Sequence, residues 1–90
     1  GVLLGRKPSA EVPAGAKSVK LEDPTRTISR NHAAISFDQD GTLWIEDYGS
    51  LNGTYIIQDD VETKVEHKPM QLEAPCTVRI GDQFFQFRKQ

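Results

Sequence analysis

Short stretches of alternating apolar and polar residues recur along the chain, and turn-forming residues separate them. No window of eleven or more residues repeats apolar positions at helical spacing. Many short strands without a long helix predict an all-β sandwich or barrel. The stretches expected to form strands are Val2–Leu4, Lys17–Leu21, Ala33–Phe37, Thr42–Glu46, Thr54–Ile57, Cys76–Ile80 and Phe84–Phe87.

Two hairpins are the clearest local predictions. Asp40-Gly41 separates the third and fourth of these stretches, and an Asp-Gly pair is a strong hairpin signal. Gly81-Asp82 separates the last two stretches in the same way. Alternation places Phe85 and Phe87 on one face of the last strand, so we expect them to pack in the core. Trp44 is expected on the face opposite its neighbours in the sequence, and partly exposed.

Two segments are harder to assign from their pattern. Residues 7–16 contain Pro8, Pro13 and Gly15, which predict a loop. Residues 58–75 carry apolar positions that indicate strand pieces, but a proline and several charges interrupt them.

Composition limits the chain to a modest set of functions. Ninety residues correspond to one small domain, residues 1–90, and 11 basic against 13 acidic side chains argue against a duplex-DNA or membrane-surface protein. No apolar run approaches the roughly 20 residues that a membrane span requires. The single cysteine, Cys76, precludes an internal disulfide and is interpreted as a small buried hydrophobe. These features favour a cytoplasmic protein, or a nuclear one in a eukaryote.

The charges are distributed unevenly along the sequence. Residues 1–32 contain six basic and three acidic side chains, whereas residues 33–90 contain five basic and ten acidic ones. A local positive site on an acidic body suits a small anion on a protein partner better than a long polyanion.

Three loops have the composition of a binding site. They follow Gly5-Arg6, span residues 27–32 and span residues 47–54. Binding a phosphate group on a peptide requires arginine for paired charge-assisted hydrogen bonds, a hydroxyl or backbone N–H to complete the contacts, and a group such as asparagine to hold the peptide main chain. These residue types are supplied by Arg6, Ser29, Arg30 and Asn52.

The order of these motifs resembles the forkhead-associated (FHA) family. Its signature of Gly-Arg, Ser-Arg-x-His and Ser-x-Asn-Gly-Thr is similar to Gly5-Arg6, residues 29–32 and residues 50–54, and residues 80–85 resemble its late Gly-Asp hairpin. The resemblance covers essentially the whole chain from Gly5 onward. It implies a sandwich of two antiparallel sheets with the binding loops at one end. It also implies recognition of phosphothreonine in a partner protein, downstream of a Ser/Thr kinase.

The resemblance further implies roles for individual residues. Arg6, Ser29 and Arg30 are expected to contact the phosphate, although Arg30 could instead contact the peptide. Asn52 is expected to hydrogen-bond the peptide backbone, and Thr27 to add a further hydroxyl contact. Structural support of the site is expected from Gly5, His32 and Gly53, with a positive φ at Gly53.

Three departures from the family pattern change these expectations. Leu51 stands where the family often has a polar or basic residue, so a side-chain contact to the ligand is lost there. After Tyr55 the chain reads Ile56-Ile57-Gln58 in place of Val-Asn-Gly, which predicts a differently built turn. The family usually has another strand before the Gly-Arg motif. We therefore expect either a fragment of a longer protein that lacks this first strand, or a sheet edge that is completed in another way.

The same residues allow other function classes. The alternative to phosphopeptide binding is a β-sandwich that binds partners without phosphate, and a third option is a degenerate module with no ligand. Ser29, His32 and Asp47 include the residue types of a hydrolase triad, but the serine lacks a Gly-x-Ser-x-Gly context and lies too near the histidine in sequence. His32 and His67 are far apart, so no metal-ligand spacing exists. We expect a monomeric, non-catalytic module without metal or cofactor, and a surface position for His67.

Overall fold

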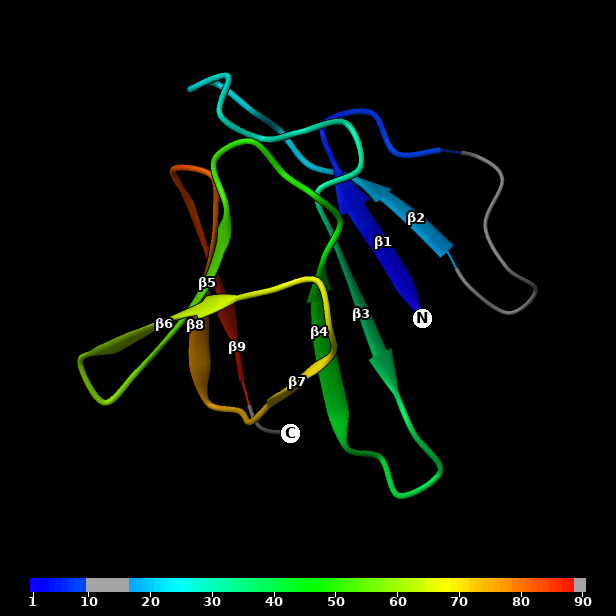
Figure 1. The fold of residues 1–90 in the computed structure, drawn as a ribbon, viewed down its shortest axis with the longest axis vertical. Helices are drawn as coiled ribbons and strands as arrows, with labels where there is room; N and C mark the ends of the chain where they lie inside the picture. The colour runs from blue at the N-terminus through cyan, green and yellow to red at the C-terminus, as the bar shows by residue number, and fades with distance from the viewer. Residues whose placement is uncertain (10–16, 89–90) are drawn as a thin grey trace.

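Two β-sheets packed face to face make up the protein (Figure 1). The computed structural model describes residues 1–9 and 17–88, and all regular structure within these ranges is β-strand. The all-β prediction is therefore confirmed. The strands are β1 (Val2–Gly5), β2 (Lys17–Lys20), β3 (Ala33–Phe37), β4 (Leu43–Asp47), β5 (Thr54–Gln58), β6 (Val61–Val65), β7 (Met70–Leu72), β8 (Cys76–Ile80) and β9 (Gln83–Phe87).

The five-stranded sheet has the order β2-β1-β3-β4-β7, and the four-stranded sheet has the order β6-β5-β8-β9. Every pairing is antiparallel except that of β1 with β2, which is parallel. The expectation of two purely antiparallel sheets is corrected at this one pair. Parallel neighbours need a long connection, and residues 6–16 separate the two strands. Of the loop predicted over residues 7–16, residues 10–16 lie outside the described residues.

The segment that was hardest to assign from sequence forms β6 and β7. A two-residue turn at Asp59-Asp60 joins β5 to β6, with φ values of 52° and 65°. Positive φ at both central residues matches the right-handed twist of the flanking strands, and aspartate tolerates this conformation better than most residues. His67 follows β6 and is exposed, as expected.

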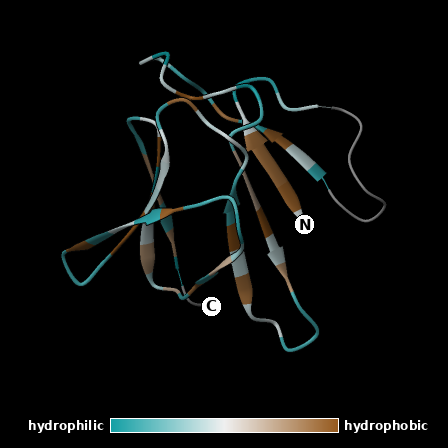
Figure 2. Cartoon of the chain, in the orientation of Figure 1, coloured by the Kyte–Doolittle hydropathy of each residue, from teal (hydrophilic) through white to brown (hydrophobic). Residues whose placement is uncertain are grey.

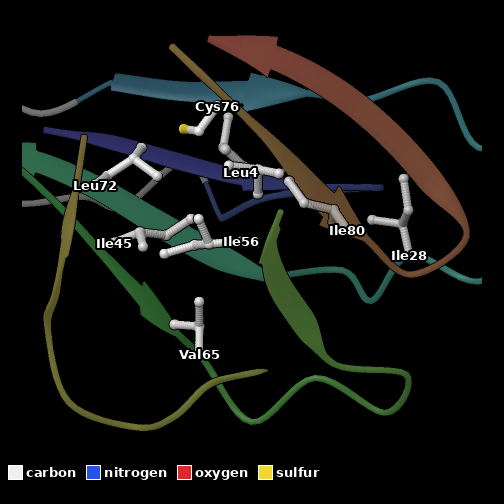
Figure 3. Packing of buried hydrophobic residues seen from close by; sticks show 9 residues of the cluster. Leu4, Ile28, Ile45, Ile56, Val65, Leu72, Cys76 and Ile80 are labelled. Carbon is white, nitrogen blue, oxygen red and sulfur yellow. The ribbon is translucent and has the colours of Figure 1, made fainter. Parts of the chain in front are cut away.

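The core lies between the two sheets, where alternating residues from both point inward (Figure 3). Phe85 and Phe87 pack against this core as predicted, while Phe84, which precedes them on β9, is 63% exposed. Cys76 is buried, also as predicted, and Trp44 is partly buried on the face opposite Ile45. Full burial of an aliphatic side chain contributes about 1.5–3 kcal/mol, so this cluster is the main source of stability. Its buried members are Leu4, Ile28, Ile45, Ile56, Val65, Leu72, Cys76, Val78 and Ile80.

Several loops gather at one end of the sandwich, beyond the C-terminal end of β1 (Figure 1). They are residues 6–9, residues 21–32 between β2 and β3, residues 48–53 between β4 and β5, and the turn at residues 81–82. Figure 2 shows that these loops are mostly hydrophilic, whereas hydrophobic positions concentrate in the strands. The end of the molecule predicted to carry the binding site therefore consists of polar loops held by a buried core.

None of the described residues forms a helix that could cross a membrane.

Candidate functional site

The segment that follows β1 runs alongside the loop that contains Ser29. The Arg6 amide donates to the Ser29 carbonyl at 2.9 Å, and the Lys7 amide donates to the Arg30 carbonyl at 3.3 Å. Gly5 is buried where the two segments are closest: a Cβ atom at this position would lie 1.8 Å from the Arg30 carbonyl oxygen. The absence of a side chain at Gly5 thus lets Arg6 and Ser29 lie next to each other.

Asp23 organises the loop before Ser29, a role that the sequence reasoning missed. Its carboxylate accepts hydrogen bonds from the amides of Thr27 and Ile28, both at 3.0 Å. Desolvation raises the pKa of Asp23, but hydrogen bonds from the Ile28 and Thr27 amides and the Thr25 hydroxyl together lower it below its ordinary value. The signal in the sequence is an aspartate before Pro24, a residue pair typical of side-chain-to-backbone turns.

His32 joins two of the loops from inside the molecule. Its side chain is fully buried; Nδ1 accepts from the Ser29 amide at 2.9 Å, and Nε2 lies 2.8 Å from the Gly53 carbonyl oxygen. An amide only donates and a carbonyl only accepts, so these bonds specify the tautomer with the proton on Nε2. Gly53 has a φ of 85°, the left-handed conformation expected for it. Of the predicted supporting residues, His32 and Gly53 thus connect these two loops.

The third loop reaches the second through two further hydrogen bonds. The Leu51 amide donates to the Ser29 hydroxyl oxygen at 3.1 Å, and the Asn52 side-chain amide donates to the Thr27 carbonyl at 2.8 Å. Because Ser29 accepts one bond, its hydroxyl hydrogen can be directed to another acceptor. The Thr27 hydroxyl accepts from the Asp82 amide at 2.7 Å and lies 2.8 Å from the Thr25 hydroxyl oxygen, so it links the loops to one another.

Asp47 fixes the shape of the third loop. This buried carboxylate accepts hydrogen bonds from the amides of Gly49 and Ser50, and from the hydroxyls of Ser50 and Thr54. Burial alone raises the pKa of Asp47, but the hydrogen bonds from Ser50 and Thr54 outweigh it, and the pKa lies below its usual value. The ionised Asp47 carboxylate therefore stabilises the loop.

Acidification is expected to weaken the fold through Asp47. Its pKa is lower in the folded protein than in the unfolded chain, where an aspartate titrates near about 3.9. The stabilisation is fully present above the unfolded-state pKa and is lost as the pH falls through the folded-state pKa. Urea unfolding between about pH 5 and pH 2 should show this decline in the free energy of unfolding, and Asp47→Asn should show a shallower one. If the free energy of unfolding fell equally with pH in both proteins, Asp47 would be excluded as a contributor to the loss of stability in acid.

The loops enclose a hollow of about 700 Å³ that carries three arginine side chains. Arg6, Arg26 and Arg30 all line it, and none of them forms an ion pair with another described residue. Arg26, with a φ of 58°, is a second residue that the sequence reasoning missed. The complete lining is Arg6, Asp23, Arg26, Thr27, Ile28, Ser29, Arg30, Leu51 and Asn52. All five predicted ligand-contact residues therefore meet around one positively charged hollow.

Ser29, His32 and Asp47 do not have the arrangement of a hydrolase triad. The Ser29 backbone amide, rather than its hydroxyl, bonds to His32. Both oxygens of the Asp47 carboxylate bond to groups of its own loop and the start of β5. In residues 1–9 and 17–88 no group of three histidine, cysteine, aspartate or glutamate residues could hold a metal ion.

A family model described as FHA domain matches residues 2–81 of this chain. The chain belongs to the FHA domain family. FHA domains are protein-interaction modules. The chain is also similar in fold to a crystal structure of the FhaA FHA domain complexed with the intracellular domain of Rv3910, with a TM-score of 0.60 and 23% sequence identity. The match covers 91% of this FHA domain and 72% of the other chain.

Proposed function

We propose that this FHA domain binds a phosphothreonine-containing segment of a partner protein. The observation that carries the proposal is the hollow where Arg6, Arg30 and the Ser29 hydroxyl lie together without an anionic partner from another part of the described chain. A phosphorylated side chain carries about −1.5 to −2 charges and three acceptor oxygens, so it matches a site of arginines and a hydroxyl donor.

The hydrogen bonds within the site indicate which atoms of each residue remain to contact the phosphate. The Nε of Arg6 donates to the Ile28 carbonyl at 3.4 Å, which orients the guanidinium and leaves its terminal amino groups for the phosphate. Ser29 directs its hydroxyl hydrogen to a phosphate oxygen, and Arg30 adds charge at the rim. Arg26 lines the same hollow and adds to its positive potential.

We assign the binding of the peptide main chain to Asn52. Its Nδ2 is held by the Thr27 carbonyl, so its Oδ1 can accept a hydrogen bond from a peptide amide. Because the Thr27 hydroxyl accepts from the Asp82 amide and is also paired with the Thr25 hydroxyl, we assign Thr27 to positioning Asn52 rather than to direct contact. Leu51 contributes its backbone amide to Ser29, so the hydroxyl contact does not need a polar side chain at position 51.

In this role the domain acts after a Ser/Thr kinase has modified its partner, as a monomeric, non-catalytic module in the cytoplasm or nucleus. The competing possibility is partner binding that does not depend on phosphate. The two modes of binding differ in how much the arginines of the hollow contribute to affinity. Screening by salt weakens contacts between exposed arginines and phosphate, so the proposed mode also predicts affinity that falls as ionic strength rises.

The decisive test is a titration with a library of phosphothreonine peptides and with the same peptides unphosphorylated, followed by fluorescence anisotropy. Only the phosphorylated library should bind. Arg6→Ala should weaken binding by on the order of 10-fold to 100-fold, because hydrogen bonds to charged groups contribute about 1.5–3 kcal/mol.

Arg88→Ala is the matched control, since Arg88 is exposed and lies outside the residues that line the hollow. It removes the same charge from the protein and should leave affinity unchanged. Equal binding of both libraries, or equal losses in the two variants, would contradict phosphate recognition at this site.

A further inference from the structure

The four-stranded sheet has an open edge at β6. Its order is β6-β5-β8-β9, so β6 pairs with β5 on one side and with no other described strand on the other side. The tip of the β5–β6 hairpin projects away from the rest of the molecule (Figure 1). Val61 is 61% exposed, and residues 62–64 are exposed as well. An open edge strand presents unpaired N–H and C=O groups with which another strand can pair.

The two-residue turn between β5 and β6 determines which backbone groups face this open side. Such a turn closes on a hydrogen-bonded pair, here Gln58 with Val61, and hydrogen-bonded pairs then recur at every second residue of the ladder. Residues 61, 63 and 65 therefore direct their backbone groups to β5. The N–H and C=O groups of Glu62 and Lys64 point to the open edge.

The sequence of β6, Val-Glu-Thr-Lys-Val, is complementary to a reversed copy of itself. In an antiparallel pair of two copies, a two-fold axis through Thr63 places Glu62 of each copy opposite Lys64 of the other. Since both residues direct their backbone groups to the edge, each such pair can exchange two hydrogen bonds. Opposite charges at directly opposed positions stabilise a strand pair, and so does a Thr–Thr pair at the axis. Val61 of each copy lies opposite Val65 of the other on the inner face.

The charged side chains of β6 are available for this pairing. Oε1 of Glu62 lies 2.8 Å from Nε of Arg79 on the same face of the sheet, which orients the carboxylate and leaves Oε2 for a second cation. Lys64 forms no ion pair with another described residue. Each copy therefore offers one positioned carboxylate and one unpaired ammonium group to the other.

Charge also selects this register over its neighbours. Opposed residues in a strand pair point to the same face, so the axis must pass through a residue. An axis through Glu62 would oppose two glutamates, and an axis through Lys64 would oppose two lysines, and like charges at opposed positions are destabilising. The edge strand β2 of the other sheet carries two lysines and no acidic residue, so it cannot form an opposite-charge pair with a second copy of itself.

We propose that β6 is a self-association edge, through which two copies of the domain pair as antiparallel strands about an axis at Thr63. The pairing joins the two four-stranded sheets into one continuous sheet. Because each copy contributes a single strand, the interface is small, so the domain is monomeric when dilute and associates at high local concentration. None of residues 61–65 lines the arginine-rich hollow, so each copy keeps its own open hollow. Self-association therefore does not depend on the proposed phosphopeptide binding.

The test is sedimentation velocity over a concentration series up to the millimolar range, together with amide chemical shifts over the same series. The sedimentation coefficient of the wild-type domain should rise with concentration, and the amides of Glu62 and Lys64 should shift most. Lys64→Glu and Glu62→Lys each bring like charges opposite one another, so each variant alone should associate about tenfold more weakly or less. An equimolar mixture of the two variants should associate again, because every opposed pair then carries opposite charges.

Lys17→Glu is the matched control, since it makes the same change of charge on the exposed strand β2 and should associate like the wild type. Both β6 variants should stay folded, because the ion pair lost in Glu62→Lys is partly exposed and contributes little to stability. A wild-type sedimentation coefficient that stays constant up to millimolar concentration would overturn the proposal. Association that Lys64→Glu leaves intact, or shifts confined to another edge such as β9, would do the same.

Discussion

Replacing Gly5 with alanine is expected to destabilise the domain by about 3 kcal/mol or more, the upper part of the range for overpacked sites. The new Cβ would lie 1.8 Å from the Arg30 carbonyl oxygen and 2.6 Å from its carbonyl carbon. Both atoms belong to backbone that is hydrogen-bonded to the segment after β1, so neither can move away without breaking those bonds. We therefore expect separation of Arg6 from Ser29 and loss of phosphopeptide binding together with the loss of stability.

Gly41→Ala separates this steric effect from the general cost of replacing a glycine. Gly41 has a φ of 80°, but a Cβ atom there would have nothing within 4 Å, so alanine is strained only by its backbone conformation. That strain costs on the order of 1 kcal/mol. Urea unfolding should show a clearly larger loss for Gly5→Ala than for Gly41→Ala, and similar losses would mean that the loop near Arg30 can adjust.

His32→Ala is expected to destabilise the domain by about 3 kcal/mol, because it removes a fully buried side chain and two hydrogen bonds. The Ser29 amide and the Gly53 carbonyl would each lose a partner. Since these groups belong to different loops, the variant should also weaken the proposed phosphopeptide binding, although the His32 side chain itself is fully buried.

His32→Asn provides a graded comparison. An asparagine oxygen can take the place of Nδ1 and accept from the Ser29 amide, but the shorter side chain cannot reach the Gly53 carbonyl. Its free energy of unfolding should fall between those of the wild-type domain and His32→Ala. Amide chemical shifts should move mainly near Gly53 in the asparagine variant, and near both Ser29 and Gly53 in the alanine variant. An alanine variant as stable as the wild type would rule out the bridging role of His32.

Sequence patterns predicted the parts of this protein that depend on near neighbours in the chain. Alternation identified most strands, because side chains at successive strand positions point to opposite faces. It also placed Phe85 and Phe87 against the core. The left-handed conformation of Gly53 was among the expectations that the family resemblance implied. The ordered motifs carried the family resemblance, since they combine several loops into one pattern.

The tertiary structure alone decided how those loops meet. The parallel pairing of β1 with β2, and the hollow in which Arg26 lies together with Arg6 and Asn52, both depend on residues far apart in the sequence. The order of the strands and backbone contacts such as that of Gly5 with Arg30 bring these residues together. No local periodicity in the sequence encodes either of them. The sequence by itself therefore indicated which residues could form a phosphate site, and the packing of the sheets determined that they line one hollow.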